Sequence, residues 1–182
     1  TNISLDLVGQ ARMYYQYAAN LKGADFTEDT WAYLRDAWDY RNVLLTEQPN
    51  GDWGQTIVRQ FFFDAWHYYL LEGLRNSRDE QLRAIAEKSL KEVTYHLRYS
   101  SEWMIRLGDG TKESHSRMQQ AVDLLWPFTG ELLTPNVLDQ QMTEEGIAPK
   151  LEKIKSAWHA KVADILQQAT LKQPETNWMQ SG

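Results

Sequence analysis

The sequence has no cysteine and few residues that interrupt helices. Without cysteine, this stretch of chain can form no disulfide, no thiolate metal site and no cysteine nucleophile. Only 5 Pro and 10 Gly occur in 182 residues, which is typical of a globular chain with long regular elements. No apolar run approaches the roughly 18 residues of a membrane-spanning helix. We therefore expect a soluble, cytoplasmic protein with no membrane partner.

Basic clusters are also missing. The chain has 19 Lys and Arg against 25 Asp and Glu, which gives a net charge of -6. Because nucleic-acid-binding domains carry a basic patch or stripe, we do not expect nucleic acid as a partner. The sequence likewise contains no Gly-rich phosphate loop, no Ser-His-Asp arrangement and no nucleophile elbow.

No alternating run of β-branched residues is present, whereas apolar residues recur at helical spacing along most of the chain. Residues 55–75 are apolar around nearly the whole helix, so we predict that this helix is central. Long helices joined by short turns predict an all-α, antiparallel bundle. The predicted helices cover residues 3–21, 27–45, 55–75, 79–107, 112–133, 137–144 and 151–169.

Two of these helices have local features that can be checked. Thr27 is the predicted N-cap of its helix, but Thr30 stands where a full capping box would have Glu or Gln. Pro127 lies inside the range 112–133. Because proline lacks the N–H that the helix interior needs, we predict a kink near Asp123.

The helix predicted at 79–107 contains a particularly informative pair of residues. Val93 and His96 lie three residues apart, so both face the same, inward side. An inward His three residues after a Glu is half of the site with which four-helix carboxylate proteins hold two iron ions. Because Val93 occupies the Glu position, we hypothesise a di-iron scaffold that has lost its metal.

Two carboxylate and histidine pairs remain as candidate metal ligands. Asp64 and His67 are three residues apart, Glu92 and His96 are four apart, and either spacing can place both side chains on one metal. A two-iron site needs about four carboxylates and two His from four helices, and the helix at 3–21 offers no His. The alternative interpretation is that Asp64 and His96 are buried polar groups that satisfy one another.

Five stretches, spread along nearly the whole chain, carry a family resemblance. They are NISLDLVGQAR at 2–12, LLTEQPNG at 44–51, DAWH at 64–67, KEVTYHLR at 91–98 and MTEEGI at 142–147. In this order they resemble the family of structural C subunits of bacterial 1,2-phenylacetyl-CoA epoxidases, the ring-hydroxylating complexes of phenylacetate degradation. The resemblance implies a ferritin-like bundle.

In that family the di-iron centre belongs to a related protein, the catalytic A subunit. The di-iron subunit resembles Asp-Glu-Ala-Gly-His where this chain has residues 6–10, and Lys-Glu-Glu-Ser-Phe-His where it has 91–96. Two Glu ligands and one His ligand are thus replaced, and two ligand-like residues remain. The resemblance therefore implies vestigial metal positions, with no bound metal and no catalytic residue, at Leu7, Gln10, Asp64, Val93 and His96.

The resemblance also implies a function. Complexes of this family use molecular oxygen and electrons from NADPH to epoxidise the ring of phenylacetyl-CoA in aerobic phenylacetate catabolism. The di-iron subunit performs the chemistry, and a reductase subunit with flavin and an iron-sulfur centre delivers the electrons. We expect this chain to be inert by itself and to hold no cofactor. Its expected role is that of a scaffold that pairs with the di-iron subunit, with the other subunits of the complex as further partners.

The expected organisation is one ferritin-like domain at 1–171 and an irregular tail at 172–182, with the family's first and last helices outside this sequence. We expect the helices at 3–21 and 55–75 to contribute to the partner-facing surface. Two alternative functions stay open. One is an active di-iron or single-metal oxygenase that uses Asp64, His67, Glu92 and His96. The other is a stand-alone helical homodimer with an unrelated binding role.

Overall fold

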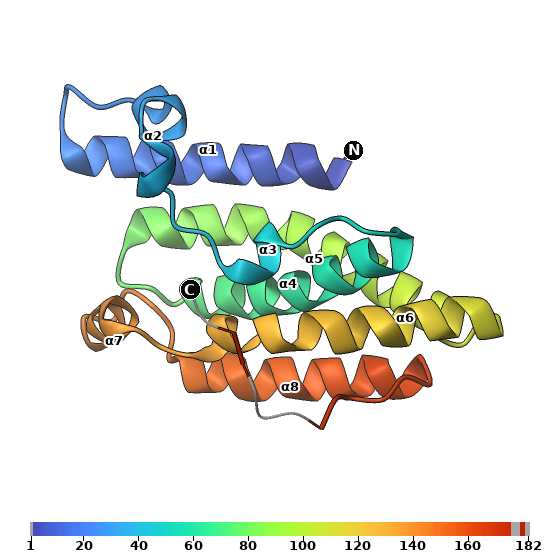
Figure 1. The fold of residues 1–182 in the computed structure, drawn as a ribbon. Coiled ribbons are helices and arrows are strands. Elements are labelled where there is room, and N and C mark those ends of the chain that lie inside the picture. Colours follow the sequence, from blue (N-terminus) through green and yellow to red (C-terminus); the bar gives the residue numbers. More distant parts are fainter. Residues whose placement is uncertain (1, 176–178, 181–182) are drawn as a thin grey trace.

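Helices form the regular structure of residues 2–175 and 179–180, which are the residues that the computed structural model describes. Within them there is no β-strand. The all-α prediction is therefore confirmed (Figure 1). Of the predicted tail, residues 172–175 and 179–180 are described and contain no helix, and residues 176–178 and 181–182 lie outside the described residues.

Helix α4 (Trp53–Leu74) is the centre of the fold. It packs against α5 (Glu80–Gly108), α6 (Lys112–Leu125) and α8 (Leu151–Gln168) (Figure 1). Because its neighbours pack on several sides of α4, as predicted, the apolar residues around its circumference are buried or half-buried. We call these four helices the body.

N-cap residues mark where the first two helices of the body begin. Asp52 begins α4 by accepting a hydrogen bond from the backbone N–H of Gln55 at 2.9 Å. Asp79 begins α5 in the same way, accepting from Leu82 at 2.8 Å. These caps satisfy N–H groups that the first helical turn leaves without partners, so the sequence fixes where each helix begins.

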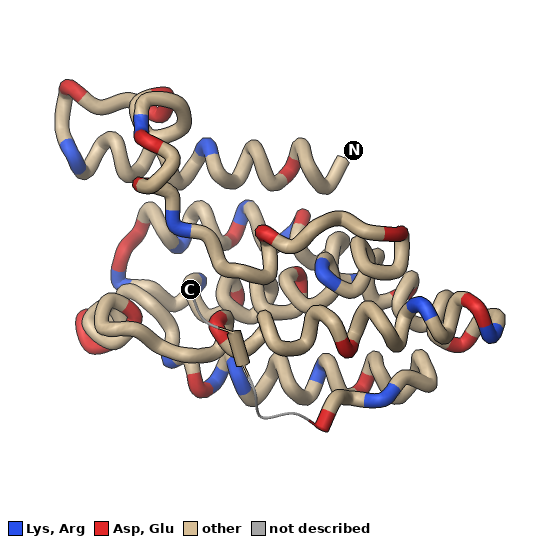
Figure 2. Tube along the Cα trace, viewed as in Figure 1, with Lys and Arg blue, Asp and Glu red and all other residues tan. Residues whose placement is uncertain are grey.

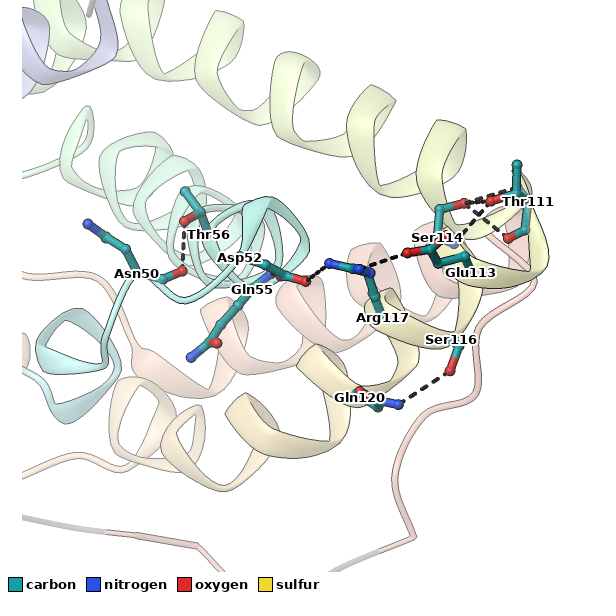
Figure 3. A network of polar contacts seen from close by, with 10 residues as sticks. All are labelled: Asn50, Asp52, Gln55, Thr56, Thr111, Glu113, Ser114, Ser116, Arg117 and Gln120. Atoms are coloured by element: carbon teal, nitrogen blue, oxygen red, sulfur yellow. Dashed lines mark hydrogen bonds and ion pairs between the residues drawn. The ribbon is translucent and has the colours of Figure 1, made fainter.

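A polar network joins the start of α4 to the start of α6 (Figure 3). The Arg117 guanidinium lies 3.3 Å from Asp52 and 2.7 Å from Glu113. Thr111 caps α6 by accepting from the N–H of Ser114 at 3.1 Å. All three members of the ion-pair cluster are well exposed, so the pairs contribute little to the free energy of folding.

Helix α1 (Asn2–Lys22) packs on α5 and on the short helix α2 (Glu28–Tyr33), and it lies along one side of the body (Figure 1). The predicted range 3–21 is confirmed, and Gly23 ends the helix with a φ of 118°, which suits glycine. Only Gln10 and Ala19 of α1 are buried. We call residues 2–40 the lobe.

The prediction of one helix at 27–45 is wrong. Helix α2 ends at Tyr33, and the short helices η1 (Ala37–Asp39) and α3 (Leu44–Glu47) follow. Two residues of the expected inward stripe are mostly exposed, Leu34 at 76% and Trp38 at 90%. Apolar spacing alone did not form a helix here because the described chain leaves Leu34 and Trp38 largely uncovered.

Contacts of the Arg35 side chain, instead of an apolar stripe, hold the segment after α2 in the lobe. Its side chain donates to the carbonyl of Trp31 at 2.6 Å and to the hydroxyl of Tyr15 at 3.2 Å. The guanidinium carbon also lies 4.1 Å from the centroid of the Tyr40 ring, which is cation–π geometry. A cation surrounded by three aromatic side chains therefore holds this segment against α1.

The capping box at α2 is complete, contrary to the expectation from sequence. The Thr27 hydroxyl accepts from the N–H of Thr30 at 3.2 Å, and the Thr30 hydroxyl accepts from the N–H of Thr27 at 3.1 Å. A threonine therefore fills the role that Glu or Gln usually has in this motif.

Pro127 ends α6 instead of kinking it. The α-helix stops at Leu125, and the 3-10 helices η2 (Trp126–Phe128) and η3 (Gly130–Leu133) continue the chain. Pro127 lies in the first turn of η2, where a missing N–H costs nothing. Helices α7 (Val137–Glu144) and α8 then agree with the predicted ranges.

Acidic and basic residues are interspersed along the helices (Figure 2). None of the described helices combines the length and apolarity that a membrane span requires.

Candidate functional site

The five predicted site positions lie on three helices around one seam. Leu7 and Gln10 are on α1, Asp64 is on α4, and Val93 and His96 are on α5. Four of the five are buried, and Leu7 is partly exposed. Because α5 contacts both α1 and α4, it brings the side chains of all three helices together.

Hydrogen bonds between polar side chains join α1 to α5. Nε2 of His96 lies 2.9 Å from Oδ2 of Asp6, and Nε2 of Gln10 donates to Oε2 of Glu92 at 2.7 Å. Further along, the Tyr17 hydroxyl donates to Asp79. The partners follow opposite orders along the two helices, so the polar pairs fix an antiparallel register.

Asp64 makes its hydrogen bonds to residues other than His96. Its Oδ1 accepts from the amide of Gln60 at 2.6 Å, and its Oδ2 accepts from the hydroxyl of Ser100 at 2.8 Å. The interpretation of Asp64 and His96 as a mutual pair is therefore wrong, because His96 bonds to Asp6 instead. Burial raises the pKa of Asp64 from 3.8 to about 6, although both hydrogen bonds and the charge of His96 oppose that shift.

His67 is buried beside this layer and is neutral at pH 7. Burial lowers its pKa from 6.5 to about 4, and the nearby charge of His96 lowers it further in the same direction. Its ring stacks on Trp66 at a centroid distance of 6.3 Å. Nδ1 of His67 and Nδ1 of His96 are buried and have no hydrogen-bond partner among the described residues.

The donor set does not fit a two-iron centre. Such a centre needs about four carboxylates and two histidines directed at one point. Leu7 and Val93 have no atom that could coordinate a metal. One oxygen of Glu92 accepts a hydrogen bond from Gln10. Both oxygens of Asp64 accept hydrogen bonds, from Gln60 and Ser100. Within residues 2–175 and 179–180, no group of three or more His, Asp or Glu is arranged to hold a metal ion.

Sequence reasoning missed two partners in this layer. Asp6 lies one helical turn before Gln10 and therefore on the same face, which was the available signal for its pairing with α5. Ser100 lies one turn after His96, but serine is too common in helices for that spacing to be informative. Both pairings depend on how α1 and α4 pack against α5, which the sequence alone does not give.

An antiparallel helical bundle with a buried layer of carboxylate, histidine and amide side chains belongs to the ferritin-like class. More specifically, the chain belongs to the family described as "Phenylacetic acid catabolic protein", which it matches over residues 1–182. It is 48% identical over 181 residues to the C subunit of the 1,2-phenylacetyl-CoA epoxidase of Escherichia coli (strain K12). That alignment covers 100% of this chain and 73% of the relative. The resemblance seen in the sequence is confirmed.

Proposed function

We propose that this chain is a non-catalytic, structural subunit of a multicomponent phenylacetyl-CoA epoxidase and that it pairs with the di-iron subunit. The observation that carries the proposal is 48% identity to a relative named as the C subunit of such an enzyme. Leu7, Gln10 and Val93, which stand where the resemblance implies metal ligands, support it. In this assignment the di-iron subunit holds the metal, and a reductase subunit supplies electrons through flavin and an iron-sulfur centre.

The chemistry of the seam supports a structural role. A cluster of buried carboxylates requires a metal or other compensating charge, and replacing some of its members by apolar residues removes that requirement. Val93 is fully buried on α5. The remaining polar residues join helices directly, because Gln10 binds Glu92 and His96 binds Asp6. Side-chain hydrogen bonds therefore connect α1 to α5 where metal coordination would connect helices in a catalytic relative.

A scaffold must also offer a surface to its partner. Helix α4 offers little, because it is covered by the rest of the body, so the expectation that residues 55–75 share the partner surface has weak support. The outer face of α1 is a better candidate, since Leu5 and Val8 are 68% and 67% exposed. Exposed aliphatic side chains on one helix face are typical of a surface that another helix covers.

Iron analysis distinguishes this proposal from the oxygenase alternative. The full-length protein is reconstituted with Fe(II) without oxygen, beside the variants Asp64→Ala and His96→Ala. We expect iron near zero in all three proteins. About two irons per chain in the parent protein, lost in both variants, would show that this chain is itself an oxygenase.

Co-purification with the di-iron subunit distinguishes the proposal from a stand-alone homodimer. We expect a stable complex of the two proteins, and slower hydrogen exchange in the helices of the di-iron subunit when this chain is bound. A photocrosslinking residue at Val8 should react with the di-iron subunit, whereas one at Leu138, which is 61% exposed on α7, should not. Failure to co-purify would favour the homodimer, and a crosslink from Val8 within the same chain would remove α1 from the partner surface.

A further inference from the structure

A groove between α1, α4 and α5 has an unusual composition. It has a volume of about 340 Å³ and is formed by the first turn of α1, the first two turns of α4 and the middle of α5. Its sides include the aromatic rings of Trp53, Tyr95 and Tyr99. None of the described residues that line it carries a charge.

The aromatic side of the groove is held in place by neighbouring rings. Tyr95 stacks on Tyr99 with centroids 6.2 Å apart, and Tyr99 meets Trp103 edge to face at 6.4 Å. Trp103 in turn meets Trp53 of α4 edge to face at 5.9 Å. This ladder of four rings spans two helices of the body, so the aromatic wall is formed before any ligand arrives.

Two of these rings remain about half exposed. Trp53 is 49% exposed and Tyr95 is 46% exposed, although both contact other aromatic rings. Covering them would remove apolar area from water at a gain of roughly 25 cal/mol per Å². The groove therefore offers stacking surface that the described chain leaves uncovered.

Hydrogen-bonding groups in the groove are neutral. Gln60 lines it, and the amide nitrogen of Gln60 donates to the buried Asp64 at 2.6 Å. Ser4 and Thr56 also line it, and the Thr56 hydroxyl donates to the carbonyl of Asn50 at 2.8 Å. Tyr95 and Tyr99 add two phenol groups. Because none of the described residues lining the groove is charged, a charged ligand would lose hydration without gaining a counter-charge from them.

From these observations we propose that the groove is a binding site for a small, uncharged aromatic molecule of one or two rings. The size agrees, since 340 Å³ lies at the low end of the roughly 300–1,000 Å³ found for ligand pockets. Ring stacking on Trp53 and the tyrosines supplies the affinity, and the neutral amide and hydroxyl groups select against ionised compounds. The site is separate from the proposed structural role and does not depend on it.

Binding of indole to the full-length protein tests the proposal. Isothermal titration calorimetry, supported by saturation-transfer NMR, should give a dissociation constant of about 1 mM or tighter, which is typical for a molecule of this size. Benzoate, which is charged, and cyclohexanol, which is not aromatic, should each bind several times more weakly. Equal affinities for the three compounds, or no binding of indole, would overturn the proposal.

Variants locate the binding. Trp53→Leu removes one wall and should weaken indole binding about threefold to tenfold, because one aromatic contact is lost. Trp38→Leu is the matched control, since Trp38 is 90% exposed in the lobe and lies outside the groove. Ser4→Trp fills the groove from an exposed position and should abolish binding without loss of helicity. Unchanged binding in Trp53→Leu and Ser4→Trp, or an equal loss in Trp38→Leu, would place the ligand elsewhere.

Discussion

The body and the lobe of this protein are both helical, but different interactions hold them. In the body, Phe62 and Trp158 are fully buried, and the indole N–H of Trp158 donates to the Phe62 carbonyl at 2.9 Å. In the lobe, α2 has no buried residue, and Arg35 joins the segments through cation–π contacts and hydrogen bonds. Apolar burial therefore stabilises the body, and polar and aromatic surface contacts stabilise the lobe.

This difference predicts that the body is more stable against unfolding than the lobe. Free energy from burial scales with apolar area, so the body should unfold as one cooperative unit. The contacts of α1 to α5 include three side-chain hydrogen bonds, each with a net contribution of about 1 kcal/mol. The lobe should therefore open at lower free energy than the body, which suits a region that a partner contacts.

The largest expected effect comes from emptying the aromatic core of the body. Phe62 contacts Trp126 and Trp158 at centroid distances of 5.8 Å, so Phe62→Ala should leave a cavity. We expect a loss of about 3–5 kcal/mol in the free energy of unfolding. Trp38→Ala in the lobe should change it by less than about 0.5 kcal/mol. Urea denaturation of both variants measures the contrast, and similar losses would mean that the lobe has a core of its own.

Two buried groups on α4, Asp64 and His67, should change the stability of the protein with pH in opposite directions. The pKa of Asp64 is raised from 3.8 to about 6, so the folded state binds this proton more tightly, and this group favours folding as pH falls from 6 to 4. The pKa of His67 is lowered from 6.5 to about 4, so this group disfavours folding as pH falls over the same range. In the parent protein the two effects largely cancel.

Single variants should separate these two effects. Asp64→Asn leaves His67 as the one of these two groups that titrates, so its contribution to stability should fall between pH 6.5 and pH 4 by at most about 3 kcal/mol. His67→Phe leaves Asp64, whose contribution should rise by a similar amount as pH falls from 6 to 4, and the difference between the two variants cancels the groups that they share. Denaturation at a series of pH values measures both slopes. Slopes of the same sign in the two variants would contradict the assignment.

The sequence predicted the body better than the lobe for a physical reason. Periodic apolar residues mark a helix correctly where another part of the same chain covers them, as it does for Val93 and Trp158. The same periodicity at Leu34 and Trp38 was misleading, since the described residues leave both side chains largely exposed. The spacing of apolar residues indicates which side chains share one face of a helix. It does not indicate whether another segment packs on that face.

The polar layer was only partly predictable. Inward positions for Val93 and His96 followed from helix geometry and are confirmed by their burial. The partners of His96 and Asp64 did not follow, because they depend on the register between helices far apart in sequence. Whether these residues are remnants of a metal site stays a prediction, which the iron analysis tests.

A close contact within the body provides the third test. A Cβ added at Gly108 would lie 2.4 Å from the carbonyl oxygen of Ala169, which follows α8, and that backbone cannot move easily. Gly108→Ala should therefore separate the ends of α5 and α8 and destabilise the protein by about 1–3 kcal/mol. Thermal unfolding measures the effect. A neutral result would show that these helix ends are more loosely packed than the structure indicates.

The smallest expected effect has the opposite sign and lies in the lobe. Gly9 is inside α1, and a Cβ added there meets nothing within 4 Å. Glycine inside a helix costs about 0.5–1 kcal/mol relative to alanine, so Gly9→Ala should stabilise the isolated chain by about that amount. If a partner helix approaches α1 closely at this point, the same variant should weaken the complex with the di-iron subunit. If Gly9→Ala stabilises the free chain and lowers its affinity for the di-iron subunit, Gly9 lies in the contact with that subunit. If the free chain is stabilised and this affinity is unchanged, the di-iron subunit contacts another face.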